Sequence, residues 1–508
     1  MERAREKYWL RYPSTSPFKL RWRAIAVRHC FHVLPGETIL EIGAGSGLWT
    51  RHLTEVLRNE NPITAAVFND EFSEPRGPQH RAAWPDNVWF QKIDDLASLP
   101  AESFDYVVGT AILCHDMCPR NLQAIYRLLK PGGQILFFEA NFWNPQSMVK
   151  SMLPNRWTGQ ASCHVSMRKY NLMRAASERG FIDIEVIPYD IIHPLALKMA
   201  IPFLRSIAFA VEHAPVIREL CGTLYIRAQK PGDEQARRPK VNLARHCELF
   251  GSTSFVVPCH NEEMNIAPLV DTLVGFYGPY IHEIIIVNDN SRDRTAEVTR
   301  EVAKREPRVK LVDRKPPNGV GRALRDGYAA ATGRYIFTMD SDFVQITPEF
   351  RDLFDAIHRG RDGAIGSRFS HDSLLINYPF LKIFCNRSFH LLANLLLPVR
   401  MRDISNNLKL YRAEILKTID IEQPHFAANA ETGLKPLLAG YDIEEVPISW
   451  IQRSLDMGSS TFNVPKVAKN YFIALASIVW SAWRQRDELR MRRAARAAAA
   501  GGNGTRLG

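Results

Sequence analysis

The chain has 508 residues, too many for one hydrophobic core, so two or three domains are expected. It is 46% hydrophobic and 23% charged, as ordinary folded proteins are, which excludes extensive disorder. The net charge of +11 favours anionic partners. No zinc-finger spacing, helix-turn-helix or RNA-binding signature accompanies that charge, so we expect phosphate-bearing substrates or anionic lipid and no nucleic acid.

Three features bear on the cellular location. Eight cysteines occur without a CxxC pair, a pattern typical of reduced thiols in the cytoplasm. The N-terminal segment has charges and aromatic residues but no continuous apolar run, so no signal peptide is expected. No stretch reaches the ~20 apolar residues that span a bilayer. We therefore expect a cytoplasmic protein.

The first motif is the glycine-rich segment of residues 40–50, which follows an apolar run. The pattern predicts a strand, a tight turn and a helix. Gly43, Gly45 and Gly47 let the backbone turn sharply and approach a ligand, and the helix start offers free N–H groups. Alone, this spacing is shared by dinucleotide enzymes and by purely structural turns.

With Glu41 before the first glycine, the segment resembles motif I of the class I S-adenosylmethionine-dependent methyltransferases. The resemblance implies that Glu41 holds the methionine amino group and that the three glycines contact the cofactor. A second strand at residues 63–68 ends in residues 69–71, where the family places an acid on the ribose hydroxyls, with Asp70 as the candidate. Asp94 or Asp95 would reach the adenine amino group.

Later segments continue the family's order of strands and helices at residues 103–110 and 128–139. The resemblance implies a doubly wound, Rossmann-like α/β sheet with its ligand at the strand C-termini. His115 and Asp116 follow the fourth strand, as a base or acceptor contact or as a capped helix start. Residues 195–218 are unusually apolar and fit either a lid over a hydrophobic acceptor or a buried helix.

A charged, proline-bearing segment at residues 231–251 predicts a linker between a first domain, residues 1–230, and a second, residues 252–462. The second domain opens with a strand that runs into Pro258, Asn261 and Glu262. This entry resembles that of the family-2 inverting glycosyltransferases, which have the GT-A fold.

That resemblance implies several contacts to a nucleotide-sugar. Asp289 falls on the acid that contacts the base, although Asn288, Asn290 and Arg294 depart from the family's residues there. Gly319 and Gly321 would let the chain approach the sugar-diphosphate. Arg322, beside them, would neutralise phosphate.

The segment Ile336–Phe343 is the centre of the second domain. A buried strand ends in Asp340, Ser341 and Asp342, and period-two alternation puts both carboxylates on one side of the pleat. Unpaired, they would repel, whereas Mg2+ or Mn2+ would relieve the repulsion and leave room for phosphate oxygens. An ordinary acidic loop is the alternative. The GT-A resemblance favours the metal and adds Asp340 and Ser341 to the nucleotide-sugar contacts.

Later motifs, in residues 364–462, resemble the dolichol-phosphate mannosyltransferase-like, polyprenyl-phosphate branch of that family, and no QxxRW motif of processive synthases is present. The resemblance implies a lipid-phosphate acceptor, whose oxyanion needs no strong general base. Arg368, Arg387 and Arg453 are the candidates for gripping that phosphate, because guanidinium matches phosphate bidentately. Arg453 is also assigned to catalysis with Asp340 and Asp342.

The C-terminal part predicts membrane contact. Residues 373–397 alternate apolar clusters with cations, which is typical of a helix in the membrane interface. Residues 463–493 hold an apolar helix followed by arginines, the pattern of a peripheral anchor on anionic lipid, with packing on the catalytic domain as the alternative. The tail, residues 494–508, is of low complexity and predicted to be disordered.

Together these patterns predict two doubly wound α/β domains with a C-terminal amphipathic helix. The expected protein is a bifunctional transferase at the cytoplasmic face of a membrane. Its second domain would transfer a hexose from a nucleotide-sugar to a polyprenyl phosphate. The alternatives are a glycosyltransferase for another lipid or a soluble glycan, and a first domain that only binds S-adenosylmethionine or acts as a scaffold.

Overall fold

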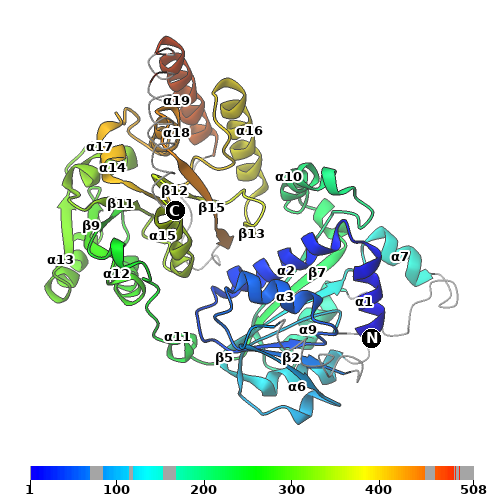
Figure 1. The fold of residues 1–508 in the computed structure, drawn as a ribbon. Helices are drawn as coiled ribbons and strands as arrows, with labels where there is room; N and C mark the ends of the chain where they lie inside the picture. The colour runs from blue at the N-terminus through cyan, green and yellow to red at the C-terminus, as the bar shows by residue number, and fades with distance from the viewer. Residues whose placement is uncertain are drawn as a thin grey trace, which may run out of the picture. The chain divides into compact units, whose positions relative to one another are not determined.

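The computed structural model describes residues 2–68, 84–113, 118–152, 168–451, 464–485, 487 and 491. The chain divides into two compact units, Met1–Lys240 and Val241–Gly508, and each contains one seven-stranded sheet (Figure 1). The predicted fold class, two α/β domains, is confirmed. Within the described residues, no helix has the length and apolar character that crossing a bilayer requires.

The sheet of the first unit is parallel except at one edge. Its strand order is β3-β2-β1-β4-β5-β7-β6, and β7 runs antiparallel to both β5 and β6. Because the order reverses between β1 and β4, the carboxyl ends of these two strands form the switch point where α/β sheets bind ligands. The strands are β1 (Ile39–Ile42), β2 (Ile63–Val67), β3 (Val88–Lys92), β4 (Phe104–Thr110), β5 (Leu129–Ala140), β6 (Ile182–Tyr189) and β7 (Thr223–Gln229).

Helices and apolar side chains complete this unit. Leu40, Val107 and Ile135, from three adjacent strands, are fully buried in its core. The helices are α1 (Glu2–Arg11), α2 (Ser16–Phe31), α3 (Leu48–Val56), α6 (Cys118–Leu128), α7 (Pro145–Met152), α9 (Lys169–Ser177), α10 (Ile201–Val211) and α11 (Glu234–Arg237).

The apolar segment 195–218 contains α10, and it is not a buried helix. Leu197, Met199 and Phe203 are 76%, 95% and 69% exposed, and only one face of α10 is buried. The second of the two sequence-based alternatives is therefore wrong. An apolar surface is left open instead.

Part of the predicted linker, residues 231–251, packs into the first unit. Helix α11 brings Arg237 to the buried carboxylates of Glu37 and Asp105, and Arg238 lies 3.4 Å from Glu37. We call Arg237 and Arg238 the linker latch. After the latch in the sequence, the Leu243 N–H donates a hydrogen bond to the Phe276 carbonyl at 2.7 Å, and both residues belong to the second unit. Residues 239–242 alone separate these two attachments.

The second sheet has the order β10-β9-β8-β11-β14-β12-β15. Strands β10, β9, β8 and β11 are parallel, whereas β14 runs antiparallel to β11 and β12. Strands β13 (Leu374–Ile376) and β16 (Ser449–Ile451) form a separate small sheet. The main strands are β8 (Thr253–Cys259), β9 (Ile281–Asn288), β10 (Val309–Asp313), β11 (Tyr335–Thr338), β12 (Gly363–Ser367), β14 (Lys409–Arg412) and β15 (Ile443–Pro447).

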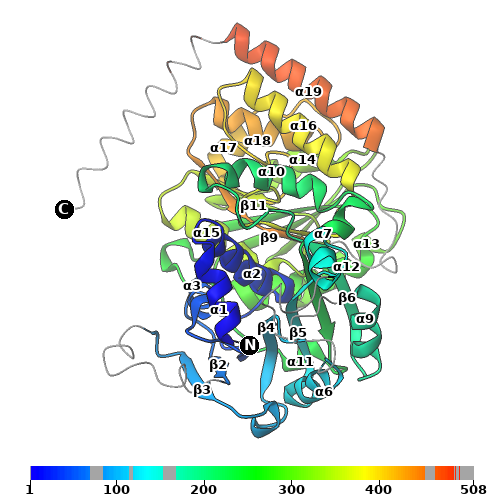
Figure 2. The ribbon, with the colours of Figure 1, turned by 90° about the vertical axis from the view of Figure 1, so that its right-hand side faces the viewer.

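In the sequence, the helices of the second unit connect these strands or follow the last of them. They are α12 (Glu263–Tyr277), α13 (Thr295–Arg305), α14 (Val320–Ala330), α15 (Arg351–His358), α16 (Phe380–Leu396), α17 (Ala413–Thr418), α18 (Ala428–Leu438) and α19 (Val464–Arg484). Helices α16 and α19 lie side by side (Figure 2).

Helix α19 has two different faces. Ala474, Leu475 and Ile478 are buried in the core of the unit, so the predicted packing on the catalytic domain is present. Trp480 and Trp483 are 60% and 67% exposed. Helix α16 likewise exposes a row of large apolar side chains, namely Leu381, Phe384, Leu391, Leu395 and Leu396. The two helices therefore offer apolar surface as well as packing against the domain.

Candidate active sites in the two units

Glu41 lies at the carboxyl end of β1, at the switch point of the first sheet. The side chain is buried, and its Oε2 has no hydrogen-bond partner among the described residues. Burial raises the pKa of Glu41 to about 7, against the opposing effects of the Thr50 hydroxyl and the Arg5 guanidinium. An orphaned buried carboxylate of this kind is suited to receive a cationic group from a ligand.

The glycine-rich turn after Glu41 adopts the conformation that the sequence predicts. Gly43, Gly45 and Gly47 have φ of +71°, +59° and +83°, in the left-handed region that favours glycine. A Cβ at Gly47 would lie 2.7 Å from the Trp84 ring, and one at Gly45 would lie 2.8 Å from a Glu6 carboxylate oxygen. Side chains therefore already surround this turn closely.

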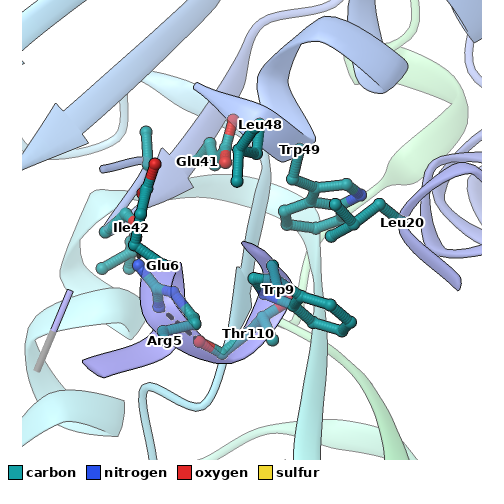
Figure 3. A pocket seen from close by; sticks show the side chains of 11 residues that line it. Arg5, Glu6, Trp9, Leu20, Glu41, Ile42, Leu48, Trp49 and Thr110 are labelled. Atoms are coloured by element: carbon teal, nitrogen blue, oxygen red, sulfur yellow. Dashed lines mark hydrogen bonds between the residues drawn. The ribbon is translucent and has the colours of Figure 1, made fainter. Parts of the chain in front are cut away.

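Helix α1 covers the pocket beside the turn (Figure 3). Arg5 donates hydrogen bonds to the carbonyls of Gly43 and of Thr110, which end the two switch-point strands. Glu6 accepts hydrogen bonds from the Ser46 backbone N–H, at 3.2 Å, and from the Ser46 hydroxyl. The sequence analysis missed this contribution, because charged residues at an N-terminus carry no local signal of a partner some 40 residues away.

A second buried acid, Glu139, ends β5 near the same pocket and was also missed. Its Oε1 accepts two hydrogen bonds of 2.8 Å from the backbone N–H groups of Ile112 and Leu113. Burial raises the pKa of Glu139 to about 7 despite these bonds. Glu139 thus fixes the loop after β4. The only signal in the sequence was an acid directly after a run of apolar residues.

The two predicted adenine-binding acids differ in their surroundings. Asp95 caps a short 3-10 helix by accepting from the Ala97 N–H at 3.2 Å, and it pairs with Arg120 at 2.5 Å. The Ala97 hydrogen bond lowers the pKa of Asp95, as does the Arg120 bond. Asp94 is exposed and is the acid that remains available. Asp70, His115 and Asp116 lie outside the described residues.

In the second unit, Asp340 and Asp342 follow β11, beside the switch point between β8 and β11. Burial, reinforced by the charge of Asp342, raises the pKa of Asp340 to about 7. The Asn407 amide donates to Asp340 Oδ1 at 2.6 Å and opposes this shift, while Asn407 Oδ1 is buried without a partner among the described residues. Asn407 enters from the neighbouring strand segment and was not predicted.

Predicted nucleotide contacts gather at the ends of β8 and β9. Pro258 is half-buried in β8, and the loop after it is joined to the loop after β9 by two hydrogen bonds. The Asn261 N–H donates to the Ser291 hydroxyl at 2.9 Å, and the Glu262 N–H donates to the Thr295 hydroxyl at 2.9 Å. The Glu262 charge helps to raise the pKa of Asp340, after burial and Asp342, so this loop lies near the acid pair. Ser341 is buried between the two acids of the pair.

Asp289 already has strong partners in the structure. Its carboxylate forms an ion pair with Arg314 and accepts from the Gly319 N–H at 2.6 Å. Its carboxylate therefore orders the loop that begins α14. This role does not depend on a nucleotide.

Gly319 and Gly321 approach another part of the chain. A Cβ at Gly319 would lie 2.2 Å from the Pro424 carbonyl oxygen, and one at Gly321 would lie 2.1 Å from that of Gln423. Neighbouring Arg322 donates to the Asn318 carbonyl at 2.7 Å. Close backbone packing therefore accounts for both glycines.

The arginines predicted to bind lipid phosphate are not equivalent. Arg368 is buried and forms a bidentate pair with fully buried Asp403, through hydrogen bonds of 2.7 and 2.9 Å. Arg387, on α16, is half-buried, and its guanidinium lies 5.7 Å from the centroid of the Phe369 ring. Burial lowers the pKa of Arg387, and Arg402 adds to that effect. Arg453 lies outside the described residues.

Two further buried groups of the second unit have shifted pKa values, Lys409, which senses the charge of Asp340, and His390, which senses that of Asp403. Lys409 is fully buried, donates to the Asn429 carbonyl at 2.7 Å and to Thr432 at 2.6 Å, and its pKa is lowered to about 7 by burial. Burial lowers the pKa of His390 to about 4. The neutral ring accepts the Ile404 N–H and donates to the Asn386 carbonyl.

Both sites fit the groups that the sequence resemblances imply. In the first unit, an orphaned carboxylate oxygen beside a tight glycine turn suits a cationic, nucleotide-like cofactor. In the second, two neighbouring carboxylates and an orphaned amide oxygen are hard oxygen donors, which Mg2+ and Mn2+ prefer.

Comparison with protein families agrees with the two units. Residues 21–186 match the model of a methyltransferase domain, and residues 254–420 match that of glycosyl transferase family 2. Over 215 residues, the chain is 29% identical to polyprenol monophosphomannose synthase of Mycolicibacterium smegmatis, covering 40% of this chain and 78% of that enzyme. It is 27% identical over 200 residues to dolichol-phosphate mannosyltransferase of Pyrococcus furiosus, covering 39% of this chain and 56% of that enzyme.

Solved structures give weaker likenesses. A glucosyl-3-phosphoglycerate synthase from Mycobacterium tuberculosis, in complex with phosphoglyceric acid, aligns over 47% of this chain and 85% of its own, with a TM-score of 0.36 and 17% identity. A possible histamine N-methyltransferase from Thermotoga maritima aligns over 45% of this chain and 95% of its own, with a TM-score of 0.30 and 18% identity.

Proposed function

Because the chain joins a methyltransferase domain to a family 2 glycosyltransferase domain, we propose that it is a bifunctional transferase acting on lipid-linked sugar. The second domain transfers a hexose from a nucleotide-sugar to a polyprenyl phosphate with inversion, and the first uses S-adenosylmethionine. The observation that carries the proposal is the acid pair Asp340 and Asp342 at the switch point. The similarity to two polyprenol-phosphate and dolichol-phosphate enzymes supports the choice of acceptor.

In the second domain, Asp340 and Asp342 would hold Mg2+ or Mn2+, which when bound would neutralise the charge that develops on the departing nucleoside diphosphate. Asn407 holds Asp340 through its 2.6 Å hydrogen bond and favours the ionised carboxylate. Pro258, Asn261, Glu262 and Ser341 line the donor side, and Asp289 fixes the loop through Gly319.

The acceptor needs little activation. A phosphate monoester is anionic at neutral pH, so the lipid oxyanion attacks the sugar without a general base. Arg387 and Arg453 bind this phosphate, whereas Arg368 supports the site through Asp403. Arg387 is half-buried and has no carboxylate bonded to it among the described residues, whereas Arg368 is bonded to Asp403. This difference supports Arg387 as the residue that binds phosphate and Arg368 as the one that supports the site.

In the first domain, Glu41 receives the amino group of the cofactor's methionine part. The cofactor supplies an electrophilic methyl group when bound. The three glycines give its carboxylate and ribose close access to the backbone, and Asp70 and Asp94 are assigned to the ribose and adenine. Helix α1 covers the cofactor pocket through Arg5 and Glu6 and excludes water from it.

The exposed apolar faces of α16 and α19 lie on the cytoplasmic surface of an anionic membrane. Their large side chains and the arginine-rich segment after residue 483 support peripheral binding. Replacing Trp480 and Trp483 by serine should release the protein from anionic vesicles in a flotation assay. Trp89→Ser, at a similarly exposed tryptophan of the first unit, is the matched control. Equal flotation of all forms would contradict the anchor.

Transfer itself is tested with polyprenyl phosphate and a panel of nucleotide-sugars, with products identified by mass spectrometry. We expect a hexosyl phospholipid, in amounts that depend on Mn2+ or Mg2+. Transfer to a soluble sugar in its absence would favour the alternative acceptor class. Labelled S-adenosylmethionine in the same reaction separates an active first domain, which labels a product, from a scaffold that labels none.

A further inference from the structure

A cluster of imidazoles and carboxylates lies on the second unit away from the acid pair. One ligand atom from each of His246, Glu248 and His358 lies within 4.8 Å of the other two. His246 and Glu248 come from the segment that leads into β8, and His358 ends α15. Both segments lie at the amino-terminal ends of their neighbouring strands, opposite the switch point where Asp340 and Asp342 lie.

Two imidazole–carboxylate pairs make up this cluster. His246 Nε2 lies 2.7 Å from Asp355 Oδ1, and His358 Nδ1 lies 2.5 Å from Glu248 Oε1. The two rings stack with their centroids 4.0 Å apart and their planes 15° from parallel. Two imidazoles and two carboxylates therefore gather within a small volume.

The backbone around the cluster is well supported. The Tyr280 hydroxyl accepts from the Arg245 and His246 N–H groups at 2.7 and 2.8 Å. The Tyr280 ring packs on Phe354 of α15, with centroids 4.4 Å apart. The two segments that carry the ligands are therefore held at a fixed separation by contacts that do not involve the ligands.

We propose that His246, Glu248 and His358 form a binding site for a divalent transition metal such as Zn2+. Imidazole nitrogen with carboxylate oxygen is a donor set that Zn2+ accepts. Asp355 accepts a hydrogen bond from His246 or binds beside it, as carboxylates do around metal-bound histidines. The metal would join the segment before β8 to the end of α15.

The test uses untagged full-length protein in the Cys247→Ser background, because Cys247 is exposed and adjacent. Excess Mg2+ keeps the hard oxygen site at Asp340 and Asp342 occupied. Calorimetry with ZnCl2 should then show one site. Zn2+ should also raise the melting temperature.

Substitutions identify the ligands. His358→Ala and His246→Ala should each weaken Zn2+ binding by at least about 100-fold, and Asp355→Asn by about 10- to 100-fold. His282→Ala removes an exposed histidine of the same unit outside the cluster and should leave binding unchanged. Unaltered Zn2+ affinity in the double variant His246→Ala/His358→Ala, measured on protein with a wild-type circular dichroism spectrum, would overturn the proposal. So would the absence of a Zn2+ site in the parent protein.

Discussion

Glu41 in the first unit and Asp340 in the second occupy corresponding places. Glu41 lies near the carboxyl end of β1 and Asp340 follows β11, each at the switch point of its sheet, and burial raises the pKa of each to about 7. Their neighbours differ in sign. The positive charge of Arg5 lowers the pKa of Glu41, whereas the negative charge of Asp342 raises that of Asp340.

The difference indicates what each site is built to receive. In the first unit one guanidinium, that of Arg5, serves both Glu41 and Glu139, so one further positive charge would complete the balance. Two adjacent carboxylates need a divalent cation to be ionised together. The charges at the two switch points therefore favour a monovalent cationic group in the first unit and a divalent metal in the second.

The largest effect is expected at the acid pair. Asp342→Asn keeps the shape of the side chain but removes one charge, and glycosyl transfer should fall by at least about 1,000-fold, or about 4 kcal/mol in the transition state. Binding of S-adenosylmethionine should not change. The melting temperature of the metal-free protein should rise slightly, because the repulsion is relieved.

The matched control for that variant is Asp271→Asn, which removes an exposed acid of α12 paired with Arg305. It should transfer hexose at the wild-type rate. Chelation of the wild-type protein should reproduce the loss, and Mn2+ or Mg2+ should restore activity. Full activity of Asp342→Asn would mean that the acid pair does not hold a divalent metal required for transfer.

If the first site is complete within its own unit, a fragment of residues 1–240 should fold and bind S-adenosylmethionine. A fragment of residues 1–232 lacks the linker latch and leaves buried Glu37 and Asp105 without Arg237, so it should be less stable by about 3 kcal/mol. Urea unfolding of both fragments measures this. Equal stability would mean that the latch contributes nothing.

A smaller effect is expected at Glu41. Glu41→Gln removes the charge that receives the cofactor's amino group, and S-adenosylmethionine should bind about 100-fold more weakly, because a buried charged hydrogen bond is lost. Glu55→Gln makes the same substitution at an exposed acid of α3 and serves as the control. Calorimetry at pH 8 checks both variants.

The raised pKa of Glu41 makes this binding pH-dependent. In the free protein the group is protonated below about pH 7, so a cation can bind only after a proton leaves. Wild-type affinity should fall by up to about tenfold for each pH unit below 7, and this dependence should vanish in Glu41→Gln. Because the pKa of Glu41 is raised in the folded protein, the protonated side chain stabilises the fold at low pH. This stabilisation is lost as the pH rises through 7.

The smallest effect is expected at Asn407, which favours the ionised form of Asp340. Asn407→Ala removes the 2.6 Å hydrogen bond, so the pKa of Asp340 should rise and Mn2+ should bind about tenfold more weakly at pH 7. At pH 9 most of the difference should disappear, because Asp340 is then ionised in both proteins. A loss that persists at pH 9 would mean that Asn407 contributes through packing or as a ligand.

The sequence predicted the residues whose signal is local. Glu41, the three glycines and the acid pair all lie at the end of an apolar strand or just after it, and strand ends are visible in the pattern of side chains. Their partners were missed because they come from elsewhere in the chain. Arg5 reaches Gly43, Glu139 reaches Ile112, and Asn407 reaches Asp340 across 67 positions.

The predictions for the remaining residues show the same limit. Gly319 and Gly321 were assigned to a ligand on family resemblance, yet each stands against a carbonyl more than 100 positions later. Arg368 has the bidentate partner that its guanidinium requires, but that partner is the chain's own Asp403. A residue type indicates a kind of partner, and only the tertiary structure distinguishes a ligand from another part of the protein.

The linker latch has a consequence for the order in which the chain is completed during synthesis. Domains generally fold as units as they emerge, N-terminal first. Among the described residues, Glu37 obtains its cationic partners from Arg237 and Arg238, and Asp105 gains Arg237 in addition to Lys130, only after the last strand of the first unit, β7, has ended at Gln229. The ribosome must therefore synthesise the first residues of the linker before the first unit can complete its fold. Only a short segment then separates the folded unit from β8, which begins at Thr253.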